Sequence, residues 1–305
     1  MSPLRSATTR GPDPLVSGAS ADRLHYSTGE LLGADDFRDE QTYHRRQLAR
    51  ALLHLHGSGT IAGLVVQHRH KPGGVAKLDE VEIRVKPGLA LDHAGRLIEV
   101  PRDACLQLRK WFTFLGGRES TDTEVGVGHL RRAWRPDGAV AAGGAVIADL
   151  FLSFHECPRG YTPAFASGPF DALDASQPSR VRDAYELSLV LRPEVTASLP
   201  RAADPWSAVD GATVDERIAS AIRLSTAMWH NGVEAAPENP AGVDPTAVLL
   251  ARLRIPARPN SDESKPPDPD WTAAAWAVVN DVPANLDNGV RHVLLPPGAI
   301  RHLIR

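Results

Sequence analysis

The clearest pattern of apolar and polar positions begins near Asp36 and ends before Gly57. Phe37, His44, Leu48, Leu52 and Leu55 follow one another at spacings of seven, four, four and three residues, so they share one face of an α-helix. Carboxylates are concentrated at the start of this segment and arginines toward its end, which complements the helix dipole. The pattern predicts an amphipathic helix.

Capping residues predict where this helix begins and ends. Asp36 is expected to cap the first turn, with Asp39 three residues later in a weak capping box. Gly57 and Gly59 are expected to end the helix and to lead into a strand.

Most of the remaining apolar residues alternate with polar ones, which predicts strands. Val81, Ile83 and Val85 share one face, and residues 88–101 are typical of a hairpin around a turn at 92–95. Further strands are expected at 61–70, 145–154, 185–191 and 248–255, with loops at 116–128 and 133–144 and a long excursion at 158–180. The predicted fold is therefore α+β and β-rich, with antiparallel strands and hairpins, the N-terminal amphipathic helix and a second helix near 213–230.

The organisation along the chain follows from these elements. Residues 1–22 lack periodicity and are expected to form a flexible N-terminal arm. Residues 23–60 form a docking helix and hinge, and residues 61–192 a β-rich core. Residues 193–305 add a helix and C-terminal strands that pack on the same core.

Composition limits the function classes. The 305 residues are 42% hydrophobic and carry a net charge of −3, so a sizeable core is expected and a general attraction to nucleic acid is not. No apolar run reaches the length of a signal peptide or membrane span, so the protein is expected to be cytoplasmic. Cys105 and Cys157 lie far apart in the sequence and are expected to be free, buried thiols.

Candidate chemistry is sparse. His54 and His56, and likewise His68 and His70, are two residues apart, but no acidic or cysteine ligand shares their spacing, so no metal site is expected. The sequence contains no nucleophile elbow, dinucleotide fingerprint or P-loop. We therefore expect no catalytic residues, no cofactor and no enzyme activity.

Residues 24–66 and three later segments carry an ordered set of motifs. The first reads G-x-x-L-x-x-x-D-F-x-x-E-Q-x-Y, followed by a hinge that contains L-L-H and spaced glycines, and the later segments are VKPGLALDHAGRLIEVP, LFLSFHECP and PSRVRDAYELSLV. This set resembles an uncharacterised family of structural proteins associated with phage tails and contractile injection systems. The hinge is longer here than is common in that family, with Leu55, His56, Gly57 and Ser58 in it.

The resemblance implies a structural component near the baseplate or the fibre-attachment region of a phage-tail-like particle. Its partners would be other subunits of that particle, with the chain present as a homo-oligomer or in multiple copies, and the complex would act at the cell envelope or be released. We expect Phe37, Leu48 and Leu52 to pack on the sheet. The expected partner-binding residues are Tyr26, Arg38, Arg45 and Arg46.

An alternative from another class is a carbohydrate- or receptor-binding module on the same kind of particle. Trp111, Trp134, Trp271 and Trp276 would then be platforms on which sugar rings stack. The competing interpretation places these four tryptophans in the core or in strands.

Overall fold

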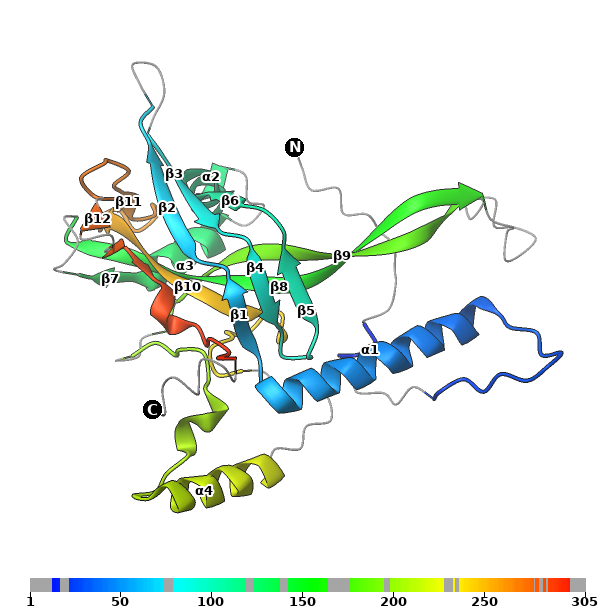
Figure 1. Cartoon of the computed structure of the whole chain (residues 1–305). Helices are drawn as coiled ribbons and strands as arrows, with labels where there is room; N and C mark the ends of the chain where they lie inside the picture. The colour runs from blue at the N-terminus through cyan, green and yellow to red at the C-terminus, as the bar shows by residue number, and fades with distance from the viewer. Residues whose placement is uncertain are drawn as a thin grey trace.

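The computed structural model describes residues 13–16, 22–73, 79–118, 123–137, 142–163, 176–194, 198–227, 233, 236–276, 278–279, 282–283 and 285–296. The fold is α+β and rich in strands, and its sheets are antiparallel, which confirms the predicted fold class (Figure 1). No helix of these residues is long and apolar enough to cross a membrane.

Two small sheets are built from the first half of the chain. One has the strand order β1-β4-β5 and the other β2-β3-β6. Their strands are β1 (Gly59–Gly63), β2 (Val66–Lys71), β3 (Glu80–Val85), β4 (Gly88–Leu91), β5 (Leu97–Val100) and β6 (Ala104–Gln107). The predicted hairpin at 88–101 is β4 and β5, which are paired from Gly88 with Val100 to Leu91 with Leu97.

The two small sheets are joined where the chain passes from β1 to β2 and from β3 to β4. At this crossing Gly63 has a φ of +64°, and a Cβ atom on it would lie 2.1 Å from the Pro87 carbonyl oxygen. Only glycine fits such a close approach of two backbones. Leu64, the next residue, also has a positive φ of 54° and is fully buried.

A third, larger sheet has β8 (Gly144–Pro163) at its centre. Its path runs β11-β10-β8-β7, while β9 pairs with β8 and β14 pairs with β10. These strands are β7 (Trp134–Pro136), β9 (Ser176–Leu191), β10 (Val248–Arg258), β11 (Asp268–Pro269) and β14 (Leu286–Asp287); a separate pair is β12 (Val278–Val279) and β13 (Val282–Pro283). All residues of β8 from Gly144 to Ser153 are buried, because core packs on both faces.

The strands β8 and β9 extend beyond this sheet as a two-stranded ribbon. Their pairing continues from Ala148 with Leu191 to Pro163 with Ser176, and the outer part projects from the body (Figure 1). The expected excursion at 158–180 is therefore wrong at both its ends, where residues are paired. The prolines that suggested a break are tolerated because the outer ribbon consists of edge strands.

Both predicted helices are present, as α1 (Ala34–His56) and α4 (Val214–Ala227). The expected loop at 116–128 is wrong: it contains the end of the π-helix η1 (Phe114–Arg118) and the start of α3 (Thr123–Ala133), which follow α2 (Leu108–Thr113). The loop expected at 133–144 contains β7. Burial of Val127, Leu130 and Ala133 in the core stabilises α3 despite its glycines. Two short 3-10 helices are η3 (Pro205–Ala208) and η4 (Asn288–Val290).

One core joins residues from Leu64 to Leu286, so the C-terminal strand β10 and both buried tryptophans belong to it together with β2, β3 and α2. The cysteines are free, as expected, but they are exposed rather than buried. Each lies on the outward face of its strand, β6 or β8, where the alternation of a strand brings it to solvent.

Candidate partner-binding surface

The helix α1 begins earlier than its sequence suggests. Gly33 is its N-cap residue, and the Asp36 carboxylate accepts a hydrogen bond of 2.6 Å from the Gly33 backbone N–H. Asp36 is therefore the third residue of the helix rather than its N-cap. The expected capping box of Asp36 with Asp39 is wrong, because the N-cap lies three residues earlier. The carboxylate still satisfies a free backbone N–H at the helix start.

The inner face of α1 is part polar and part apolar, where we expected it to be apolar. Ala49 is its buried residue, and Arg45 and Arg46 are half-buried on the same side. Phe37 and Leu48 were expected to pack on the sheet, but they are 49% and 62% exposed. Leu52 is half-buried. The apolar stripe of the helix therefore points mainly away from the body.

Ion pairs explain why this face packs inward. Arg45 lies 3.2 Å from a carboxylate oxygen of Asp13 and 3.3 Å from one of Glu156 on β8. Asp13 also accepts a 2.9 Å hydrogen bond from Arg96, which follows the turn between β4 and β5. The N-terminal segment, α1, this turn and the ribbon are thus joined by one set of charged side chains.

Arg96 is the centre of this charged cluster. Its guanidinium donates to Asp92 at 2.7 Å and to the Thr246 hydroxyl at 2.8 Å, and it lies 4.6 Å from the centroid of the Phe154 ring. Burial tends to raise the pKa of Asp13, but the hydrogen bond from Arg96 and the nearby charge of Arg45 hold that pKa below its ordinary value. Asp13 is consequently ionised near neutral pH, and α1 is held by charge on this side.

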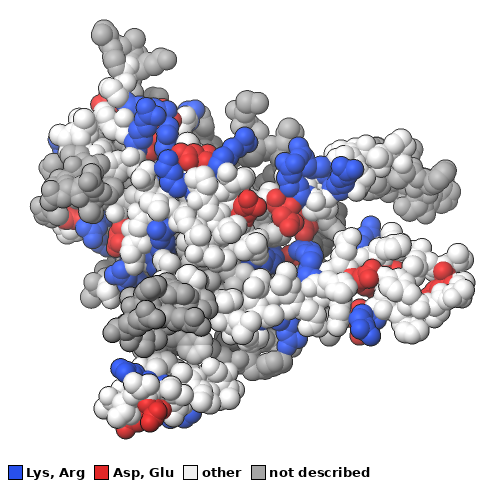
Figure 2. All heavy atoms as spheres, in the orientation of Figure 1, with Lys and Arg blue, Asp and Glu red and all other residues white. Residues whose placement is uncertain are grey.

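The outer face of α1 carries the exposed apolar side chains. Leu55 is 71% exposed, and Leu31, just before the helix, is 96% exposed. Phe37, Leu48 and Leu55 are separated by eleven and seven residues, so they lie along one stripe. Large apolar side chains gathered in this way typically mark a protein interaction site. Figure 2 shows α1 extending from the body with charged side chains among mostly uncharged surface.

The four expected partner-binding residues divide between two faces. Tyr26 and Arg38 are exposed, and Arg38 pairs with Asp35. A hydrogen bond to Glu40 raises the pKa of the Tyr26 hydroxyl. Arg45 and Arg46 lie on the inner face, so their proposed contact with a partner stays a prediction. This division could not be predicted from the sequence, because Asp13 and Glu156, which pair with Arg45, are distant from it along the chain.

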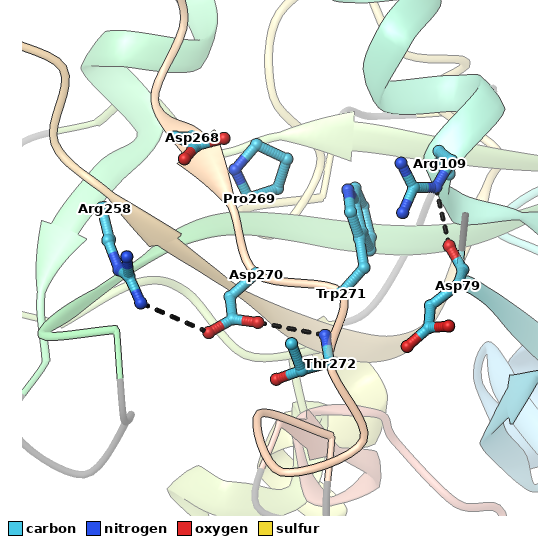
Figure 3. A pocket seen from close by; sticks show the side chains of 8 residues that line it. All are labelled: Asp79, Arg109, Arg258, Asp268, Pro269, Asp270, Trp271 and Thr272. Atoms are coloured by element: carbon cyan, nitrogen blue, oxygen red, sulfur yellow. Dashed lines mark hydrogen bonds and ion pairs between the residues drawn. The ribbon is translucent and has the colours of Figure 1, made fainter. Parts of the chain in front are cut away.

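A hollow lies away from α1, around Trp271 (Figure 3). It has a volume of about 500 Å³. Arg109 donates 2.7 Å from its Nε to the Asp79 carbonyl oxygen, and its guanidinium lies 5.2 Å from the centroid of the Trp271 ring. The lining residues are Asp79, Arg109, Arg258, Asp268, Pro269, Asp270, Trp271 and Thr272.

The tryptophans named as sugar platforms are packed against or within the core. Trp271 stacks on Trp276 with a centroid distance of 6.3 Å, and Arg109 covers Trp271 as well. Trp111, Trp134 and Trp276 donate their indole N–H groups to backbone carbonyls. The interpretation as core residues is therefore confirmed for Trp271 and Trp276, and Trp111 and Trp134 are half-buried against the same core.

The two histidines near this hollow, His68 and His70, contact neighbouring residues of the fold. His70 lies 3.1 Å from a carboxylate oxygen of Asp79 and 3.0 Å from the Trp271 carbonyl oxygen. His68 packs edge-on against Trp276, and its burial lowers its pKa. Among the residues that the structure describes, no group of three His, Cys, Asp or Glu side chains is arranged to hold a metal ion.

Comparison with known proteins gives no family assignment, because no protein-family model and no curated protein matches the chain.

Proposed function

We propose that this protein is a structural component of a phage-tail-like contractile injection particle, and that α1 makes contacts with other subunits at the baseplate or fibre-attachment region. One observation carries the proposal. The helix is held to the body by ion pairs on its inner face while its apolar stripe, with Phe37, Leu48 and Leu55, is presented to solvent. A fixed helix with an unpaired apolar face suits docking of a protein partner.

The ordered motifs of the sequence support the same assignment. They resemble those of tail-associated structural proteins over most of the chain, and the first motif, which spans residues 29–43, continues into the helix that bears the apolar stripe. The carbohydrate-binding alternative depends on accessible aromatic rings. It gains no support from the four tryptophans, because they pack in or against the core.

The test is incorporation of variants into particles purified from the native host. Leu48→Glu combined with Leu55→Glu places charge on the apolar stripe without touching the core, so the chain should fold. We expect its amount in particles, relative to sheath and tube proteins, to fall at least about tenfold, because a desolvated charge in an interface costs several kcal/mol.

A matched control uses the other exposed apolar helix face. Ile218 and Ile222 of α4 are 52% and 58% exposed. Ile218→Glu with Ile222→Glu should leave incorporation near the wild-type amount. If the α1 variant is incorporated normally, the proposed docking role of α1 is wrong, and absence of the wild-type chain from purified particles would overturn the particle assignment itself.

A further inference from the structure

The outer part of the β8–β9 ribbon has two chemically different faces. Directly opposed residues of an antiparallel pair point to the same side, and successive residues alternate. Glu156, which contacts Arg45 of α1, therefore lies on one face, together with the half-buried Phe154 and Pro158. Cys157, Arg159 and Tyr161 lie on the other face, which is exposed.

Three arginines gather on that exposed face. Arg159 is directly opposite Arg180, and Arg182 is opposite Cys157. Tyr161, 58% exposed, lies two residues beyond Arg159. Within the part of the chain that the structure describes, none of the three arginines forms an ion pair. Figure 2 shows Lys and Arg side chains gathered where the ribbon leaves the body. We call the face formed by Cys157, Arg159, Tyr161, Arg180 and Arg182 the basic ribbon face.

The N-terminal half of α1 has the complementary properties. Five carboxylates and one arginine lie between residues 30 and 40. The Asp35 side chain is 90% exposed, and Leu31 and Phe37 are exposed beside this acidic segment. A surface that combines acidic and large apolar side chains matches one that combines arginines with a tyrosine.

These two surfaces cannot meet within one chain. The opposite ribbon face, through Glu156, contacts Arg45 on the inner face of α1. The basic ribbon face lies on the other side of the ribbon, so it is turned away from α1 of the same chain. In a second copy of the chain, the acidic segment of α1 is free to approach the basic ribbon face of the first copy.

We propose that the basic ribbon face of one copy docks on the acidic N-terminal half of α1 in a second copy. Arg159, Arg180 and Arg182 would pair with carboxylates at 30–40, and Tyr161 would pack against Leu31 and Phe37. Such a head-to-tail contact uses two different surfaces, so it repeats from copy to copy and forms a ring or an open chain. The inference rests on the proposed function because it uses α1 as a docking helix, and it leaves Leu48 and Leu55 for other subunits.

The test is charge reversal in the purified full-length chain, with mass measured by analytical ultracentrifugation over a range of concentrations. The wild type should form concentration-dependent oligomers that weaken as salt is raised from about 50 mM to about 500 mM, because exposed ion pairs are screened. Arg180→Glu with Arg182→Glu should weaken association at least tenfold, and so should Asp35→Lys with Asp39→Lys.

Combining all four substitutions in one chain should restore association, because the reversed surfaces again have opposite charge. An equimolar mixture of the two double variants should also associate, since each supplies the surface that the other lacks. Arg217→Glu with Arg223→Glu on α4 is the matched control, and it should associate like the wild type.

Three results would overturn the proposal. The wild type could stay monomeric at all concentrations, or the ribbon variant could associate as strongly as the wild type, which would indicate pairing of α1 with α1. A monomeric chain that binds a DNA duplex through Arg180 and Arg182 would assign the ribbon to nucleic acid instead. None of these results changes the outcome expected for Leu48→Glu with Leu55→Glu in particles, so the two proposals fail separately.

Discussion

At the scale of single residues, the deepest ion pairs lie in the large sheet rather than under α1. The Asp149 carboxylate on β8 is fully buried and accepts hydrogen bonds of 2.7 and 2.8 Å from Arg252 on β10. Arg192, only 1% exposed, lies 3.3 Å from the same carboxylate and donates to the Glu238 carbonyl oxygen at 2.8 Å. Asp149 therefore compensates Arg252 and shares Arg192 with Glu194, whose carboxylate lies 3.5 Å from Arg192.

Asp149→Asn should be strongly destabilising. The amide keeps the shape of the side chain but removes the charge that pairs with Arg252, and it leaves Arg192 with Glu194 alone. Breaking a buried pair costs about 3–5 kcal/mol. Urea unfolding should show this loss in the free energy of unfolding with an unchanged m-value.

The exposed Asp215 in the first turn of α4 provides the control for this substitution. Asp215→Asn should cost no more than about 1 kcal/mol, since only its interaction with the helix dipole is lost. Equal effects of the two substitutions would show that Asp149 has no special role in stability.

At the scale of elements, helix periodicity predicted where α1 lies but not which face packs inward. An apolar stripe is usually the buried one, and here Arg45 packs inward because Asp13 and Glu156 supply charges from distant parts of the chain. Local patterns contain no information on such contacts. The candidate surface could therefore be located on α1 from the sequence, while the placement of Phe37 and Leu48 on it could not.

Glycine and proline misled the prediction of two other elements. Gly126 in α3 lies where a Cβ atom would be 2.1 Å from the Leu115 carbonyl oxygen, so the glycine serves close packing rather than a loop. Pro158 and Pro163 are within β8, where the outer ribbon has free edges. In both cases the tertiary surroundings allow a helix or strand where local propensity predicts a loop.

Gly63→Ala should disrupt the crossing between the two small sheets. An added methyl group would meet the Pro87 carbonyl oxygen, and the positive φ adds strain of about 1 kcal/mol, so the total loss of stability should exceed about 2 kcal/mol. Thermal unfolding followed by circular dichroism measures the change.

Gly29→Ala separates the two causes. Gly29 also has a positive φ, of +89°, but no atom lies within 4 Å of the position of an added Cβ. Its substitution should cost only the backbone strain. If both alanine variants lose the same stability, the close approach at Pro87 contributes nothing.

At the scale of the whole molecule, one core supports two projecting elements, α1 and the β8–β9 ribbon (Figure 1). The fold class follows from the apolar runs and the alternating apolar positions that predicted the strands. Of these projections, α1 was predicted but its inward face was not, and the outer ribbon was expected to be an irregular excursion. Those are also the surfaces to which both proposals assign contacts with other chains.

The outer ribbon is expected to be less stable than the rest of β8 and β9. Beyond Ser153, β8 is hydrogen-bonded to β9 alone, and two strands without a third are only marginally stable in water. In hydrogen–deuterium exchange of the isolated chain, backbone amides from His155 to Thr162, apart from Pro158, should exchange at least about tenfold faster than those from Ala148 to Leu152. Equal protection along all of β8 would contradict this. If docking occurs as proposed, assembly itself should slow these amides, so the last part of the fold would become rigid only after the chains have met.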